Sequence, residues 1–323
     1  MVVVFAELSN GTFKKAAFEA VTYASKVAAA SGTQVCAVVL GESPDVSVLG
    51  NYGANKVVHV ADARFNQLES KAYSKAIAGI ATHENADVVV FSNSITTKAV
   101  APRVAARMNA GLVAGAISLP DTTNGFTVKK SVFAGKAFAY VNVKSPVKII
   151  SITPNSFPLD KTEAVAKVVN QPSDLSPNDF VVKVLNENKV TGIVPLSEAE
   201  LVVSGGRGLK GPENWGILED LAKSVGATLA CSRPVADAHW RPHHEHVGQT
   251  GGTIRPNLYV AVGISGAIQH LAGVNSSKAI VVINKDPEAP FFKAADYGVL
   301  GDAFEIVPRL TEAFKKFKAA QHA

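Results

Sequence analysis

The chain has 323 residues, of which 47% are hydrophobic and 18% are charged, and a chain of this length corresponds to about two domains. This composition excludes an intrinsically disordered protein, and the presence of only two cysteines, Cys36 and Cys231, excludes a disulfide scaffold and a four-cysteine metal site. The net charge is +4 over residues 1–188 and +1 over residues 189–323, and neither part has the basic stripe of a nucleic-acid-binding protein.

Apolar runs alternate with helical patterns over the first 110 residues. Strands are expected at residues 2–7, 35–40, 57–60 and 88–91, and helices at residues 13–30, 68–81 and 99–108. This alternation predicts right-handed βαβ units and a parallel sheet. No apolar run approaches the roughly 20 residues that span a bilayer, so we expect no membrane insertion. Because the sequence opens on a strand without a basic leader, we expect a cytoplasmic protein.

Four strand-like runs follow with no helical pattern between them, at residues 112–119, 126–133, 138–143 and 147–152. Asn124-Gly125 is a typical hairpin turn, so we expect an antiparallel extension of the first sheet. A segment rich in Pro, Asn and Ser then leads to a last strand candidate at residues 180–185. A linker near residues 186–197 would divide the chain into an N-terminal domain of residues 1–188 and a C-terminal domain of residues 189–323.

A second series of strands and helices begins near residue 201. Its strands are expected at residues 201–203, 228–231, 258–262, 279–283 and 298–300, and its helices at residues 215–225, 267–271 and 307–318. This pattern is typical of a smaller, doubly wound α/β sheet. Ligands of such sheets bind at the carboxyl ends of the strands, so the residues after each strand are the candidates for a site.

The first of these strand ends has a glycine-rich loop in which Gly206, Gly208 and Gly211 match the pattern G-x-G-x-x-G. Pro212 would delay the helix that should follow, and Ser232-Arg233 stands where a nicotinamide site has an acidic residue. Because an arginine could bind a 2′-phosphate, an NADP-dependent oxidoreductase remains an alternative. A glycine-rich turn without a ligand is another.

Polar or glycine-rich loops follow other strands of the same sheet. Gln249 and Thr250 lie among glycines and could bind a flat heterocycle or a phosphate. The backbone amides of residues 265–267 open a helix and could contact an anion, and that helix contains His270. Asn284 and Asp302 follow later strands, where Asp302 could equally cap a helix. Together these loops predict a nucleotide-like ligand that contains a pyrophosphate.

A histidine cluster precedes the second of these loops and could bind zinc. It consists of His239, His243, His244 and His246, with Glu245 among them. The segment lacks the H-E-x-x-H pattern, so incidental metal binding is favoured over a metal centre, and a zinc-dependent hydrolase remains a third alternative. The nucleophile motif G-x-S-x-G does not occur in the sequence.

The strand-end motifs, taken in order, resemble those of the α subunit of electron transfer flavoprotein over residues 200–310. The motifs are Val-Val-Ser-Gly-Gly-Arg-Gly-Leu at 202–209, Cys-Ser-Arg-Pro at 231–234, Val-Gly-Gln-Thr-Gly at 247–251, Val-Gly-Ile-Ser-Gly-Ala-Ile-Gln-His-Leu at 262–271 and Ile-Asn-Lys-Asp-Pro-Glu-Ala-Pro at 283–290. The N-terminal half resembles the family in length and βα rhythm. The resemblance implies a nucleotide-α-hydrolase-like parallel sheet with an antiparallel extension, followed by a doubly wound FAD-binding sheet.

The resemblance also implies a set of residues that bind FAD, with no metal ligand and no catalytic residue. These are Arg207, Ser232, Arg233, Val247, Gly248, Gln249, Thr250, Ser265, Gly266, Ala267, Ile268, Gln269, His270, Asn284, Asp302 and Ala303. In the family, the arginine that matches Arg233 lies over the isoalloxazine ring and the histidine that matches His270 reaches its pyrimidine end. Reduction places negative charge there, so a cation or a donor raises the reduction potential.

The function implied by the resemblance is that of an electron carrier without substrate turnover of its own. The chain would form a heterodimer with a β subunit, which would bind AMP or, alternatively, a second FAD. Acyl-CoA dehydrogenases of fatty acid β-oxidation would donate the electrons, and a membrane electron transfer flavoprotein–quinone oxidoreductase would accept them. No nucleic acid partner is expected.

Overall fold

The computed structural model describes all residues except 134, 183, 187–193 and 322–323, and the described residues form two compact units that divide near residue 189. The first unit is built on a nine-stranded sheet with the order β11-β5-β4-β1-β6-β10-β7-β8-β9. Its strands are β1 (Val2–Phe5), β4 (Val35–Leu40), β5 (Lys56–Val60), β6 (Val88–Ser92), β7 (Gly111–Ala116), β8 (Thr127–Val132), β9 (Ala137–Asn142), β10 (Lys148–Ile152) and β11 (Lys167–Asn170). A two-stranded hairpin of β2 (Leu8–Ser9) and β3 (Thr12–Phe13) precedes the first helix.

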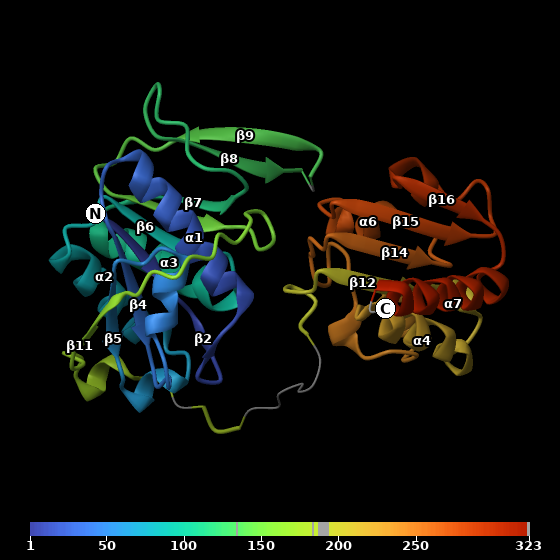
Figure 1. Cartoon of the computed structure of the whole chain (residues 1–323), viewed down its shortest axis with the longest axis horizontal. Helices are drawn as coiled ribbons and strands as arrows, with labels where there is room; N and C mark the ends of the chain where they lie inside the picture. Colours follow the sequence, from blue (N-terminus) through green and yellow to red (C-terminus); the bar gives the residue numbers. More distant parts are fainter. Residues whose placement is uncertain (134, 183, 187–193, 322–323) are drawn as a thin grey trace. The chain divides into compact units, whose positions relative to one another are not determined.

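Helices cover both faces of this sheet (Figure 1). They are α1 (Lys15–Ala30), α2 (Ser70–His83) and α3 (Ile95–Met108). The small residues of α1, such as Ala20 and Ala24, pack closely on one face, while α2 and α3 cover the other. Since successive residues of a strand point to opposite faces, Val2 and Val4 join the first core, and Val3 and Phe5 join the second. The first unit is therefore a three-layer fold, and the predicted α/β class is confirmed.

The antiparallel part of this sheet is smaller than expected. The pairings of β8 with β7 and with β9 are antiparallel, whereas β10 inserts between β6 and β7 and is parallel to both. The strand expected at residues 180–185 is wrong for the residues described there, because Val181, Val182 and Leu185 are exposed and unpaired. The strand that follows β10 is instead β11, a short edge strand whose mostly exposed residues lack a continuous buried run.

The second unit is a five-stranded parallel sheet with the order β13-β12-β14-β15-β16. Its strands are β12 (Leu201–Gly205), β13 (Thr228–Cys231), β14 (Leu258–Val262), β15 (Ala279–Asn284) and β16 (Tyr297–Leu300), and its helices are α4 (Gly216–Val225), α5 (Arg233–Asp237), α6 (Ile268–Val274) and α7 (Ala303–Gln321). In order of sequence this arrangement is 2-1-3-4-5, a doubly wound sheet whose direction of winding reverses between β12 and β14. The carboxyl ends of these two strands are the expected place for a ligand.

Two helices of the second unit differ from the sequence-based expectation. The short α5 was not expected, because five residues with Pro234 in the first turn give no periodic pattern. The last helix begins at Ala303 rather than near Val307, because the Asp302 carboxylate accepts a hydrogen bond from the Phe304 N–H at 2.9 Å and caps it. Within the described residues, no helix combines the length and hydropathy needed to cross a membrane.

Candidate functional site

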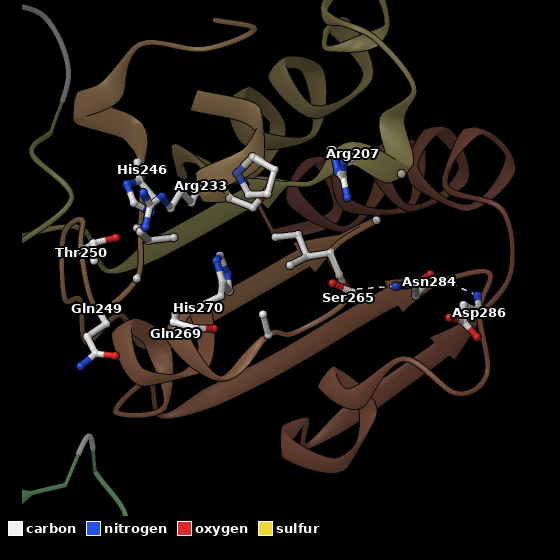
Figure 2. A pocket seen from close by; sticks show the side chains of 18 residues that line it. Arg207, Arg233, His246, Gln249, Thr250, Ser265, Gln269, His270, Asn284 and Asp286 are labelled. Atoms are coloured by element: carbon white, nitrogen blue, oxygen red, sulfur yellow. Dashed lines mark hydrogen bonds between the residues drawn. The ribbon is translucent and has the colours of Figure 1, made fainter. Parts of the chain in front are cut away.

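A cavity of about 430 Å³ opens at the carboxyl ends of β12 and β14, where the winding reverses (Figure 2). Residues from five separate stretches of the chain form its wall. The lining residues are Arg207, Gly208, Ser232, Arg233, Pro234, His246, Val247, Gly248, Gln249, Thr250, Gly263, Ile264, Ser265, Ala267, Gln269, His270, Asn284 and Asp286. The volume lies in the range of small-molecule and cofactor sites.

Close packing of two glycine-rich loops forms one end of this cavity. A Cβ atom at Gly206 would lie 2.2 Å from the Gly263 carbonyl oxygen, and one at Gly208 would lie 2.6 Å from the Gly263 Cα. The Gly206 N–H donates to the Val262 carbonyl at 2.9 Å, and the Gly208 N–H donates to the Gly263 carbonyl at 3.0 Å. These two glycines therefore allow one loop to lie directly on the other.

The dinucleotide pattern seen in the sequence does not form the structure that it usually marks. In a nicotinamide site the glycine loop leads at once into a helix, but here α4 begins only at Gly216. Gly211 does not line the cavity, and a Cβ atom there would meet the Glu213 carboxylate at 2.2 Å. The geometry thus gives no support to a nicotinamide site in this loop.

The loop after β14 presents backbone donors to the cavity. Gly266 has a φ of +83°, and a Cβ atom there would lie 2.6 Å from the Phe291 backbone nitrogen, so the turn requires glycine. The Phe291 N–H in turn donates to the Ser265 carbonyl at 3.1 Å. Among the described residues, the backbone N–H groups of Ser265 and Ala267 have no acceptor. Free backbone N–H groups that lie close together in one turn can bind anions such as phosphate.

Backbone hydrogen bonds fix the segment that contains Gln249 and Thr250. The Val247 N–H donates to the Cys231 carbonyl at 3.1 Å, and the Gln249 N–H donates to the Gln269 carbonyl at 2.7 Å. The segment therefore bridges the end of β13 and the start of α6. Both side chains line the cavity as a result, and each can donate or accept a hydrogen bond (Figure 2).

An ion-pair network around the buried Glu245 carboxylate supports this segment. The Arg241 guanidinium donates to both carboxylate oxygens of Glu245, each at 2.7 Å, and to Glu219 on α4 at 2.9 Å. Its guanidinium carbon also lies over the Trp215 ring, 5.6 Å from the ring centre, as in a cation–π contact. Since Glu245 immediately precedes the cavity residue His246, the network holds the start of the loop against α4.

His270 is the most deeply buried titratable side chain of the cavity wall, with 6% of its surface exposed. Its Nε2 atom lies 2.8 Å from the Tyr259 hydroxyl, whereas its Nδ1 atom is buried without a hydrogen-bond partner among the described residues. Burial lowers the pKa of His270 to about 4, and the nearby His246 contributes to the shift. The imidazole is therefore neutral at pH 7, with one polar atom left for a ligand.

Two arginines give the cavity a positive character. Arg207 and Arg233 both line it, and Arg233 makes an exposed ion pair with Asp237 at 3.3 Å. The negatively charged side chain of Asp286 also lines the cavity. Its carboxylate accepts a hydrogen bond from the Glu288 N–H at 3.0 Å, which stabilises the turn. The Asn284 side chain donates to the Ile264 carbonyl at 3.0 Å and so ties the end of β15 to the loop after β14 (Figure 2).

Most of the residues predicted from the sequence come together at this cavity. Those that line it are Arg207, Ser232, Arg233, Val247, Gly248, Gln249, Thr250, Ser265, Ala267, Gln269, His270 and Asn284. Gly266, Ile268, Asp302 and Ala303 do not line it, and Asp302 caps α7. Six further lining residues were not among the predicted ones: Gly208, Pro234, His246, Gly263, Ile264 and Asp286. His246 had been considered only as a metal ligand, whereas the other five lie within the strand-end motifs.

The histidine cluster does not assemble into a metal site in the part of the chain that the structure describes. No three His, Cys, Asp or Glu side chains there lie close enough together to hold an ion. His239 and His243 lie edge to face at 6.2 Å between ring centres, while His246 turns toward the cavity (Figure 2). The cluster therefore offers no geometry for a zinc-dependent hydrolase.

Comparison with known proteins agrees with this arrangement. The family model described as the electron transfer flavoprotein domain matches residues 2–174, and that described as the electron transfer flavoprotein FAD-binding domain matches residues 195–275. Proteins named electron transfer flavoprotein subunit alpha from Bacillus subtilis and Thermoanaerobacterium thermosaccharolyticum are 38% and 37% identical to the chain, with 98% of it covered in both cases and 97% and 98% of the relatives. A protein named FixB from Clostridium saccharobutylicum is 34% identical, with 98% of this chain and 97% of the relative covered. The chain therefore belongs to the electron transfer flavoprotein family, as an α subunit with an FAD-binding C-terminal part.

Proposed function

We propose that the chain carries electrons on an FAD held in the cavity of the second unit, and that it has no substrate turnover of its own. The observation that carries this proposal is the composition of the cavity wall. Free backbone N–H groups, two arginines and the unpartnered Nδ1 atom of His270 converge on one space. Bound FAD would supply the one- and two-electron redox chemistry that protein side chains lack.

The diphosphate of FAD fits the wall formed by the loop after β14. The N–H groups of Ser265 and Ala267 can donate to phosphate oxygens, and Arg207 can balance their negative charge. Asn284 already bonds the same loop and keeps it in place. These residues would bind and orient the cofactor without taking part in electron transfer.

The isoalloxazine ring fits the opposite part of the wall, near Arg233, Thr250 and His270. A cation and a hydrogen-bond donor at the pyrimidine side would stabilise the negative charge that reduction creates. Arg233 supplies the cation, and its side chain is exposed enough to move onto a bound ring. The assignment of Gly266, Ile268, Asp302 and Ala303 to the same site stays a prediction, since they do not line the cavity.

The wider role that we propose is a heterodimer in which a β subunit binds AMP. Flavin dehydrogenases such as acyl-CoA dehydrogenases of fatty acid β-oxidation would deliver the electrons, and a membrane quinone oxidoreductase would take them up. The α-subunit names of the relatives support the existence of a second subunit. We also propose that the domain boundary lies at residues 188 and 189, which the division of the compact units near residue 189 supports. A cytoplasmic location stays a prediction, which cell fractionation would test.

The experiment that tests the proposal is purification of the chain together with its β subunit, followed by identification of the bound cofactors. We expect FAD to be released on denaturation, and AMP to be released with it. Reduction of the bound flavin by an acyl-CoA dehydrogenase and its substrate would support the proposed donor. A complex that contains no flavin and takes up none would refute the carrier function, whereas a flavin that this dehydrogenase does not reduce would refute only the donor.

A further inference from the structure

A tyrosine outside the cavity lining contacts His270 from behind. Tyr259 lies on β14, is fully buried, and its hydroxyl oxygen is 2.8 Å from His270 Nε2 on α6. The Phe291 ring packs edge to face against the same imidazole, with 5.7 Å between the ring centres. These two contacts leave the imidazole little freedom to rotate, and they direct Nε2 toward the sheet.

The direction of this hydrogen bond follows from the groups around it. If His270 Nε2 donated its proton to the phenol oxygen, the Tyr259 hydroxyl proton would need another acceptor. Ser204 Oγ is the other polar atom beside the phenol, and it makes no hydrogen bond of good geometry in the described structure. A buried hydroxyl proton without an acceptor costs about 1–3 kcal/mol. A phenol that donates to a neutral imidazole avoids this cost, so Tyr259 is the donor and Nε2 is the acceptor.

The other nitrogen of the ring then carries the proton, because a neutral imidazole has a single N–H group. Since Nε2 already faces the phenol, Nδ1 is the atom left to donate. Nδ1 is also the buried atom without a partner. The contact with Tyr259 therefore favours the Nδ1–H tautomer.

We propose that Tyr259 is a positioning residue, which holds His270 as the Nδ1–H tautomer so that the imidazole offers the flavin a donor instead of a lone pair. This inference rests on the FAD site proposed above. A donor stabilises the negative charge of the reduced pyrimidine ring, whereas a lone pair would repel it. Tyr259 would thus influence the reduction potential without touching the cofactor.

The test uses the FAD-containing complex with histidine labelled for nitrogen NMR. The signals of His270 are assigned as those that disappear in His270→Gln. In the unsubstituted complex we expect a protonated-type signal for Nδ1 and an unprotonated-type signal for Nε2. In Tyr259→Phe we expect a shift of both signals toward a mixture of tautomers, and a lower first reduction potential of FAD.

Tyr23→Phe is the matched control, because the Tyr23 hydroxyl is also buried and donates to the Ser118 carbonyl at 3.0 Å in the first unit. The control should change neither the His270 signals nor the potential. An Nε2–H tautomer in the unsubstituted complex would overturn the inference, and this result does not depend on whether any variant folds. Unchanged His270 signals in Tyr259→Phe would overturn it as well.

The same set of variants separates this inference from the proposed FAD site. If His270→Gln shifts the potential but Tyr259→Phe leaves the tautomer unchanged, the site stands and the positioning role is refuted. If His270→Gln leaves the potential unchanged, the contact between His270 and FAD is refuted, and the functional part of the inference with it.

Discussion

Substitution of Gly206 by alanine tests whether the FAD site depends on direct packing between two loops. The backbone of Gly206, with φ −117° and ψ −176°, suits alanine, so the substitution adds a methyl group without backbone strain. That methyl carbon would lie 2.2 Å from the Gly263 oxygen and 2.8 Å from Ile264 Cγ1. The loops after β12 and β14 would have to separate by roughly 1 Å to restore a normal contact.

The cost of this separation can be worked out from two sources. Overpacking in a close-packed site costs about 1–3 kcal/mol. Weakening the two hydrogen bonds from Gly206 and Gly208 adds about 1 kcal/mol for each bond. We therefore expect Gly206→Ala to lower the free energy of unfolding by about 3–5 kcal/mol. We also expect at least a roughly tenfold weaker affinity for FAD, which corresponds to about 1.4 kcal/mol.

The assay is chemical unfolding together with a fluorescence titration of FAD. Gly216→Ala is the matched control, since a Cβ atom at this first residue of α4 would meet nothing within 4 Å. The control should be neutral or stabilising by about 0.4–1 kcal/mol. If Gly206→Ala matched this control in both stability and FAD affinity, the loops would not be in the contact described, and the reasoning would be refuted.

Two further predictions concern the side chains that support the site. Arg241→Ala leaves the Glu245 carboxylate buried and unpaired, so it should lower the free energy of unfolding by about 3–5 kcal/mol, and an unchanged urea midpoint would contradict this. His270, with its pKa lowered to about 4 by burial, binds fewer protons than the unfolded chain between pH 6.5 and 4, so stability should fall as the pH drops through this range, by about 3 kcal/mol in total. To isolate this contribution, the free energy of unfolding is measured at pH 7 and at pH 4.5 for the unsubstituted protein and for His270→Gln. An equal loss of stability between these pH values in the two proteins would refute the prediction.

The sequence was sufficient to predict the strands at residues 35–40, 228–231 and 258–262 with the bounds that the structure has. Strands of a parallel sheet are buried on both faces and therefore appear as continuous apolar runs. The edge strand β11 has no such run, so it escaped detection. The apolar residues 180–182 and 184–185 gave a false strand, because Val181 and Leu185 are apolar and yet exposed.

Much of the candidate site could also be predicted, because parallel strands bring their carboxyl ends to one edge of the sheet and thereby bring their loops together. The role of Gly206 could not be predicted, because Gly206 and Gly263 are far apart in the sequence and come into contact only in the folded chain. Tyr259 gave no signal at all, because a tyrosine within an apolar strand resembles any other core residue. Its contact with His270 depends on the placement of α6 against β14.

Potentiometric titration of the FAD in the complex, with and without Arg233→Ala, tests the central claim most directly. The claim is that FAD is held in the cavity of the second unit, beside a cation that favours reduction. It predicts that the variant still binds FAD and that its first reduction potential is lower than that of the unsubstituted complex. An FAD-containing variant with an unchanged potential would contradict this account of the site.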